Sequence, residues 1–161
     1  NGNPGRTLTY SFFETEVGRS IDVATDSLAK LALVSTGVSL RPIERIELET
    51  SFTDFRLYDN ETSRWRLIEK NASVVGIGHI TARDTMRLIA QYTLSKRNPA
   101  AYTFAVTPRT QTFALSLVYA HKRGLGREFN LGVTRSNVNS IGEAKQTTSE
   151  VFAKLSWAVS L

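Results

Sequence analysis

Glu47 and Glu49 are the pair of side chains in this sequence whose spacing most resembles a catalytic arrangement. Two nearby carboxyl groups can act as general acid and general base. Residues two apart share a face on any β-strand, however, so the spacing alone is common. Arg45, Arg87 and Lys154 are predicted on the polar faces of other strands, which would share an interior with the two glutamates if the sheet closed. We therefore favour a network of paired charges, because buried charges are stable mainly when they are paired.

The two histidines of the chain, His79 and His121, are the next candidates for chemistry. They fall on different predicted strands, and no carboxylate stands near either of them at the spacing of metal ligands. The chain has no cysteine, which excludes thiolate sites and a disulfide framework. No nucleophile stands beside a base, and "RGLG" at 123–126 fits a hairpin turn. We therefore expect no metal, no cofactor and no enzymatic activity.

Length and composition set the class of protein. The chain has 161 residues, which fits one domain over residues 1–161. It has no run of about 18 apolar residues and no segment that resembles a signal peptide. The net charge is +5, but the basic residues are scattered along the sequence, so we expect no nucleic-acid partner.

Alternation of apolar and polar residues runs through the sequence and predicts an all-β, antiparallel structure. In 112–122, Phe113, Leu115, Leu117 and Tyr119 share one face of a strand, and small or polar residues share the other. The same reading gives eight strands, at about 6–17, 28–41, 44–58, 64–81, 84–96, 104–122, 126–137 and 149–161.

Two of these strands break the alternation. The phase reverses at Asp54 and Phe55, which predicts either a bulge or the exit of the strand from the buried zone. In 64–81 the polar residues Glu69 and Asn71 share the parity of Trp65, which predicts a bulge or an initial loop.

The predicted links between the strands alternate in length. Those at 41–44, 81–84 and 123–126 are short, whereas 17–27, 58–63, 95–102 and 136–148 are longer and rich in turn-forming residues. This alternation is typical of an up-and-down transmembrane β-barrel, with short periplasmic turns and longer external loops.

A barrel of this kind predicts a role for each face. The residues expected to face lipid are Met86, Leu88, Leu115, Leu117, Leu131, Val133, Leu155 and Val159. Aromatic girdles are predicted from Tyr10, Tyr119, Phe129 and Trp157 at the periplasmic side and from Phe55, Tyr58, Trp65 and Tyr92 at the outer side. The residues expected to face the lumen are Arg45, Glu47, Glu49, Arg87, Gln91 and Lys154.

The end of the chain, "VFAKLSWAVSL", is apolar at alternate positions up to the last residue. Outer-membrane barrels usually end on such a pattern, which the barrel-assembly machinery reads. The ending resembles that signal at Ala153, Leu155, Trp157, Val159 and Leu161, with leucine in place of the usual last aromatic residue.

Three segments resemble one known family: "GVSLRPIERIELETSFTDFRLYD", "DTMRLIAQYTLSKR" and "EVFAKLSWAVSL". They are similar to the C-terminal barrel of a poorly characterised family of large Gram-negative outer-membrane proteins, in which a domain like carbohydrate-binding family 9 precedes the barrel. The resemblance covers about residues 10–161 and implies a location in the bacterial outer membrane. That family's barrel has more than eight strands, which implies either the end of a longer protein or a wall completed by partners.

These observations give one function hypothesis and two alternatives. The first is an integral outer-membrane β-barrel that acts as anchor, pore wall or docking unit, in contact with outer-membrane lipid and with other envelope proteins. The second is a soluble barrel or sandwich that turns the same apolar residues inward to bind an apolar ligand or a partner protein. The third is an assembly subunit whose edge strands pair with another chain.

Overall fold

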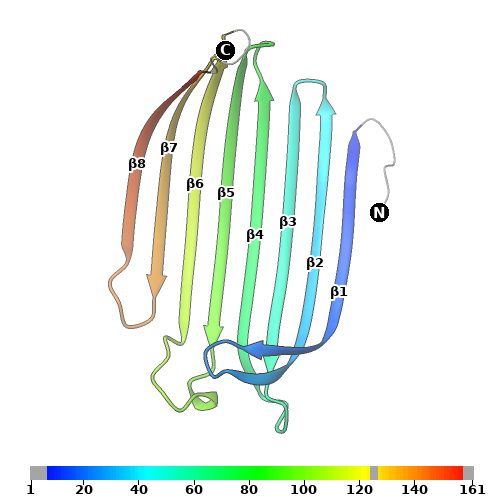
Figure 1. Ribbon diagram of the computed structural model, residues 1–161, viewed down its shortest axis with the longest axis vertical. Coiled ribbons are helices and arrows are strands. Elements are labelled where there is room, and N and C mark those ends of the chain that lie inside the picture. The colour runs from blue at the N-terminus through cyan, green and yellow to red at the C-terminus, as the bar shows by residue number, and fades with distance from the viewer. Residues whose placement is uncertain (1–6, 124–126, 158–161) are drawn as a thin grey trace.

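The computed structural model describes residues 7–123 and 127–157, and it consists of a single antiparallel sheet (Figure 1). Eight strands lie side by side in the order of the sequence, which confirms the all-β, up-and-down prediction. A short 3-10 helix, η1 (Pro99–Ala101), follows β5. The strands are β1 (Leu8–Asp22), β2 (Ser27–Ile43), β3 (Ile46–Tyr58), β4 (Trp65–His79), β5 (Asp84–Arg97), β6 (Arg109–Lys122), β7 (Arg127–Ser140) and β8 (Gln146–Trp157).

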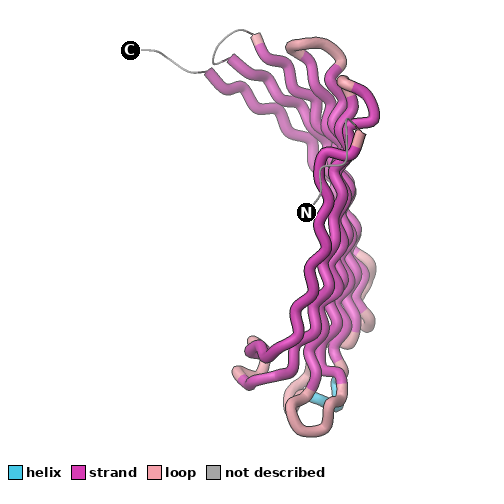
Figure 2. The backbone as a smooth tube through the Cα atoms, turned by 90° about the vertical axis from the view of Figure 1, so that its right-hand side faces the viewer, coloured by secondary structure: helices cyan, strands magenta, loops and turns pink. Residues whose placement is uncertain are grey.

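The sheet is curved and open. In Figure 2 both ends of the sheet lean to the same side, so it has one concave and one convex face. Among the described residues, β1 pairs only with β2 and β8 only with β7. The first and last strands are therefore free edges, and the closure predicted for a barrel is not present in this sheet.

The connections differ between the two ends of the sheet. At one end, the loop end, the links are residues 23–26, 59–64, 98–108 and 141–145. At the other, the turn end, the links include residues 44–45 and 80–83. The long link predicted at 17–27 is wrong, because Val17–Asp22 and Ser27–Ala32 continue the β1–β2 ladder in unbroken register. Backbone pairing there overrides the polar, turn-like composition of the segment.

The register explains both irregularities in the alternation. β3 pairs with β2 and β4 without a break from Leu48 to Leu57, so no bulge lies at Asp54 and Phe55. Instead the apolar side chains change faces: Phe55 and Leu57 lie on the concave face, where a local core forms. A register shift does occur at the start of β4, where Tyr58 pairs with Trp65 and Leu57 with Leu67, as the bulge alternative predicted.

That local core is small and lies on the concave face near the loop end. Ala29, Leu31 and Leu57 are buried, with Leu33, Phe55 and Leu67 packed against them. The loop end of the β1–β2 hairpin bends across this face, as Figure 1 shows in front of the other strands. Burial of apolar surface under the hairpin stabilises this bend, at about 25 cal/mol per Å².

Candidate functional site

The convex face carries a continuous apolar belt, which we call the convex belt. Cross-strand pairs place its members on one face, for example Leu88 opposite Leu117 and Leu117 opposite Val133. Their exposed fractions run from 37% for Leu117 to 87% for Val17. The large exposed residues of this belt are Phe13, Val17, Val34, Ile46, Phe52, Val74, Met86, Leu88, Phe113, Leu115, Leu117, Leu131, Val133, Val151 and Leu155.

Seven of the eight residues predicted to face lipid lie in this belt, whereas Val159 falls outside the described residues. Their shared face follows from the ladders of β5 to β8. Of the terminal pattern, Ala153, Leu155 and Trp157 lie on the same convex face, and Leu161 is also outside the described residues.

Aromatic side chains lie toward both ends of the convex belt. Tyr119, Phe129 and Trp157 are near the turn end, and Tyr58 and Trp65 near the loop end. Tyr92 is also on the convex face, and its hydroxyl accepts a hydrogen bond from Gln111 Nε2 at 2.8 Å.

Two aromatic residues of the predicted girdles lie on the other face. Tyr10 pairs with Ser39 on the concave face, where its ring centroid is 5.9 Å from that of Phe12. A register shift between Leu8 and Tyr10 precedes it. Phe55 belongs to the concave core. These two assignments were wrong as to face, because a bulge and the local core change which parity points outward.

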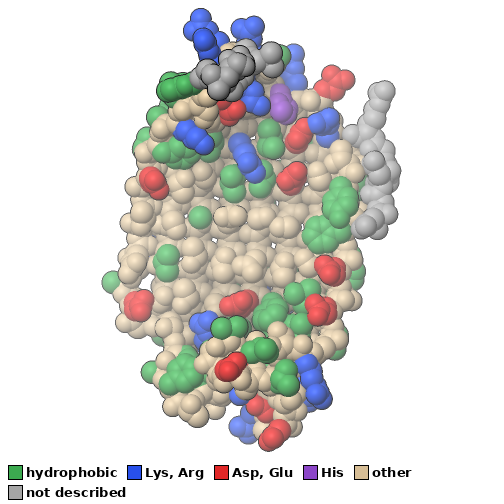
Figure 3. Space-filling model, in the orientation of Figure 1, with side chains coloured by type: hydrophobic (Ala, Val, Ile, Leu, Met, Phe, Trp, Pro, Cys, Tyr) green, Lys and Arg blue, Asp and Glu red, His purple; other side chains and the backbone are tan. Residues whose placement is uncertain are grey.

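The concave face is polar over its centre (Figure 3). Small hydroxyl side chains pair across it, such as Ser51 with Ser73 at 2.7 Å and Ser116 with Thr134 at 3.0 Å. Five of the six residues predicted to face a lumen lie here: Glu47, Glu49, Arg87, Gln91 and Lys154.

The predicted network of paired charges forms only in part. Glu47 makes an ion pair with Arg41, and His79 Nε2 lies 3.6 Å from the same carboxylate. Arg45 is in the β2–β3 turn rather than on a strand face, so Arg41 takes the place expected for it. Among the ion pairs of the described residues, none involves Glu49, Arg87 or Lys154.

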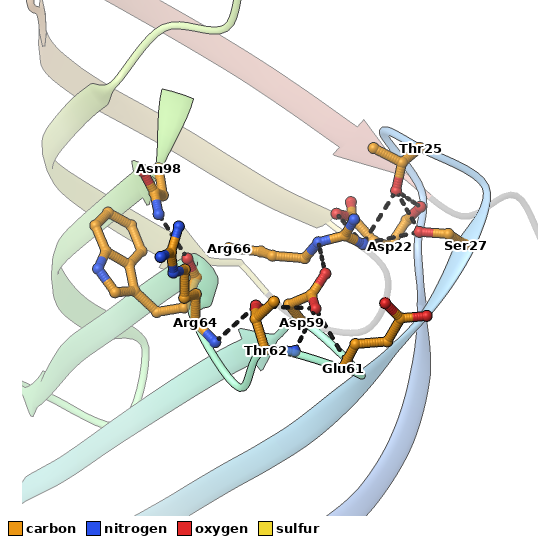
Figure 4. A network of polar contacts seen from close by, with 10 residues as sticks. Asp22, Thr25, Ser27, Asp59, Glu61, Thr62, Arg64, Arg66 and Asn98 are labelled. Atoms are coloured by element: carbon orange, nitrogen blue, oxygen red, sulfur yellow. Dashed lines mark hydrogen bonds and ion pairs between the residues drawn. The ribbon is translucent and has the colours of Figure 1, made fainter. Parts of the chain in front are cut away.

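A polar cluster holds the bent hairpin against the sheet (Figure 4). Arg66 of β4 donates from Nη1 to Ser27 Oγ of β2 at 2.8 Å, and the same atom lies 3.7 Å from Asp22 Oδ2 of β1. Arg66 Nε is 3.5 Å from Asp59 Oδ2. β1 and β4 are not neighbours in the sheet, so these contacts exist only because the hairpin crosses the concave face. We call these four residues the Arg66 cluster.

The Arg66 cluster is partly buried and incompletely hydrogen-bonded. Asp22 is 2% exposed, and its Oδ2 atom, Arg66 Nε and the hydroxyl of Tyr102 have no hydrogen-bond partner among the described residues. Beside it lies a pocket of about 230 Å³, lined among others by Asp22, Phe55 and Arg97. Buried polar atoms of this kind are stabilised chiefly by charge, which makes Arg66 the residue on which the cluster depends.

The turn end holds a second polar group, on the convex side. Asp84 Oδ1 accepts hydrogen bonds from the Tyr119 hydroxyl at 2.5 Å and from His121 Nδ1 at 2.7 Å. His121 therefore has a carboxylate partner that the sequence spacing did not reveal. In the part of the chain that the structure describes, no three metal-ligating side chains come together.

Sequence reasoning missed the Arg66 cluster altogether. Asp22 fell in a predicted loop, and Arg66 lies at a strand bulge where the parity of side chains changes. The signal that could have found it is the break in alternation at the start of β4, which marks a side chain turned from its regular face.

Tyr102, in the β5–β6 link, provides a test of the hairpin contact. Burial and the nearby Asp22 carboxylate raise the pKa of its hydroxyl above the ordinary value of 10.0. Because the pKa of Tyr102 is higher in the folded state, the neutral hydroxyl contributes to folding stability. That contribution is complete below pH 10 and is lost as the pH rises through the folded-state pKa. The ionisation of Tyr102 can be followed by subtracting the tyrosinate absorbance of the Tyr102→Phe variant from that of the wild type. We expect this difference to appear only above pH 10. A difference that appears below pH 10 would contradict the burial of Tyr102.

Comparison with protein-family models, with curated proteins and with solved structures found no match for the chain. Among the described residues, no helix is long and apolar enough to cross a membrane.

Proposed function

We propose that this chain forms wall strands of an integral outer-membrane β-barrel, where it serves as anchor, pore wall or docking unit. The observation that carries the proposal is the convex belt, in which large apolar side chains cover the outer side of a curved sheet. Soluble proteins rarely expose a continuous apolar surface of this extent. Such a surface is stable where an apolar medium surrounds it.

The dimensions of the sheet support a membrane-spanning role. Spanning strands need about 9–11 residues, tilted by about 45°. The described strands have 12 to 17 residues, enough to cross the hydrocarbon and extend beyond it. Aromatic residues at the two ends of the belt fit the height at which tyrosine and tryptophan settle at membrane interfaces.

The concave face supports a lumen rather than an apolar binding cavity. A soluble barrel that binds an apolar ligand would need the apolar side chains on its inner, concave side. Here that side carries Ser, Thr, Asn and charged residues at its centre. Its apolar side chains lie in two smaller groups, under the bent hairpin and, toward the turn end, at Val75, Ile77, Ile89 and Val118. The direction of curvature therefore favours the membrane hypothesis over the soluble one.

The free edges of β1 and β8 need pairing partners if the sheet is to span a membrane. Inside a bilayer every backbone N–H and C=O must be paired, which β structure achieves by closing on itself. The edges are exposed in this sheet, with Val17 of β1 at 87% and Val151 of β8 at 75%. Either β1 meets β8, or further strands of the same or another chain complete the wall. The resemblance to a larger barrel supports the second route, with the barrel-assembly machinery as partner during insertion.

The absence of cysteine allows a direct test with single-cysteine variants. Leu117 and Ser116 are consecutive residues of β6 on opposite faces. Each introduced cysteine is labelled with a fluorophore, and the protein is placed in lipid vesicles. The fluorophore on Leu117→Cys should be quenched by a nitroxide carried in the lipid acyl chains. The matched variant Ser116→Cys should be quenched mainly by a water-soluble quencher. Water-soluble quenching at both positions would overturn the membrane proposal.

A further inference from the structure

The charged side chains of the strands are divided unevenly between the two faces. On the convex face the acidic residues are Asp54 and Asp84. The basic residues on that face are more numerous: Arg19, Lys30, Arg56, Lys70, Lys96, Arg109, Arg127 and Arg135. The concave face carries slightly more acidic than basic residues. The acidic ones are Glu14, Glu16, Asp22, Glu47, Glu49, Glu69, Glu128 and Glu150, and the basic ones are Arg41, Arg66, Arg87, Arg97, Lys122 and Lys154. The positive charge of the chain therefore gathers on the side that carries the convex belt.

Six of these cations lie in three adjacent cross-strand rows, where the convex belt ends toward the loop end. Arg19 and Lys30 pair in the row nearest the loops, Arg56, Lys96 and Arg109 share the next row, and Lys70 lies one row further in. We call Arg19, Lys30, Arg56, Lys70, Lys96 and Arg109 the convex basic rim. Its members come from β1 to β6, which are consecutive neighbours in the sheet. On β4 and β5 the change from apolar to basic is abrupt, from Ala72 to Lys70 and from Leu94 to Lys96.

Two pairs within the convex basic rim place like charges directly opposite each other. Lys96 pairs with Arg109 across β5 and β6, and Arg19 pairs with Lys30 across β1 and β2. Like charges at such positions destabilise a sheet unless something compensates them. An anionic partner that contacted these neighbouring side chains together would relieve their repulsion.

The protein itself compensates only part of this charge. Asp54 Oδ2 lies 2.8 Å from Arg56 Nη2 and 3.3 Å from Lys70 Nζ. Among the described residues, no ion pair involves Arg19, Lys96 or Arg109. Within the described chain these three cations therefore have no carboxylate partner, and an anionic ligand could pair with them.

We propose that the convex basic rim binds the phosphate groups of lipids whose acyl chains pack on the convex belt. Phosphate oxygens accept the charge-assisted hydrogen bonds that arginine and lysine donate. Tyr92 and Phe113 are cross-strand partners just inside the rim, so an anionic head and an apolar tail would each find a matching surface. This inference rests on the proposed membrane function. It adds that the outer surface of the sheet binds lipids with anionic phosphate headgroups more tightly than other lipids.

Trp65 is a natural reporter for this site. The residue is 37% exposed, at the loop end of the convex face. Its backbone carbonyl accepts a hydrogen bond from Asn98 Nδ2 at 3.1 Å, and Asn98 lies two residues after Lys96 of the rim. The chain has two tryptophans, so Trp157→Phe leaves Trp65 as the single emitter. In phosphatidylcholine vesicles, brominated phosphatidic acid should quench Trp65 more strongly than brominated phosphatidylcholine at equal mole fraction.

Two double variants separate the site from a general charge effect. Lys96→Ser with Arg109→Ser should lower the relative affinity for phosphatidic acid by about 25-fold, because each basic residue near an anionic surface contributes a factor of about five and two are removed. Arg87→Ser with Lys154→Ser removes the same charge from the concave face and should leave that affinity unchanged. Equal quenching by the two lipids, or equal losses in the two double variants, would overturn the inference.

The same measurement distinguishes this inference from the proposed function. If brominated phosphatidylcholine fails to quench Trp65 as well, the sheet is not in the bilayer and the proposed function fails. If it quenches but phosphatidic acid has no advantage, the membrane location stands and the phosphate site is refuted. If inorganic phosphate at millimolar concentration abolishes the preference, the rim binds phosphate rather than lipid.

Discussion

Replacing Arg66 by methionine is expected to release the β1–β2 hairpin from the concave face and to lower the free energy of unfolding by about 3 kcal/mol. Methionine keeps the aliphatic volume of the side chain and removes the cation. Asp22, at 2% exposed, would then be a buried carboxylate without its ion-pair partner. Breaking a buried pair by removing one partner typically costs about 3–5 kcal/mol. We expect the lower end of that range, because the hairpin can swing out and hydrate Asp22.

Hydrogen exchange of the backbone amides in the β1–β2 hairpin measures the release of this hairpin from the concave face. In Arg66→Met, residues 21–28 should exchange faster, while the ladder between β5 and β6 stays protected. Arg64→Met is the matched control, because Arg64 lies two residues before Arg66, at the end of the β3–β4 link, is exposed, and has no ion pair among those of the described residues. Adding Asp22→Asn to Arg66→Met should restore part of the protection by removing the unpaired charge. If Arg66→Met and Arg64→Met behaved alike, the cluster would have no structural role.

The release of this hairpin also bears on the proposed lumen. The hairpin lies across the concave face at the loop end, so in a closed wall it would occupy part of the interior. If the assembled protein conducts ions, Arg66→Met should widen the passage and raise single-channel conductance.

Replacing Leu117 by arginine is expected to cost about 2–4 kcal/mol in a lipid bilayer, the range for a basic residue near mid-depth on the lipid face of a barrel. Leu117 lies in the middle of the convex belt, opposite Leu88 on one side and Val133 on the other. An arginine there would need to place its guanidinium in hydrocarbon or to reach a distant interface.

The matched control for Leu117→Arg is Ala114→Arg. Ala114 lies on the same strand but on the concave face, opposite Gln91 and Ser136. An arginine at that position can extend into the polar space, so the free energy of unfolding should change by less than about 1 kcal/mol. Both variants are measured by urea unfolding from vesicles. Equal losses for the two substitutions would contradict the assignment of the convex face to lipid.

The local arrangement of this protein follows from its sequence, because successive strand side chains point to opposite faces and the alternation can be read directly. Leu115, Leu117 and Tyr119 were predicted to share a face, and the ladder of β6 places them together. The number of strands and their order in an up-and-down sheet also followed from the alternation and the links between its segments. Errors arose where alternation was interrupted, as at Tyr10 and Phe55, because one bulge or one local core reverses which parity faces outward.

Only the tertiary structure determined which face of the sheet is concave, whether the sheet is closed, and which charges meet. Arg66 contacts Asp22 because the curvature of the sheet brings β1 over β4, strands that are not paired with each other. Similarly, Arg41 rather than Arg45 pairs with Glu47, because the β2–β3 turn places Arg45 off the strand face. Such contacts depend on the bending of the whole sheet and on strand register summed over several ladders, whereas the alternation of residues specifies only the direction of each side chain on its own strand.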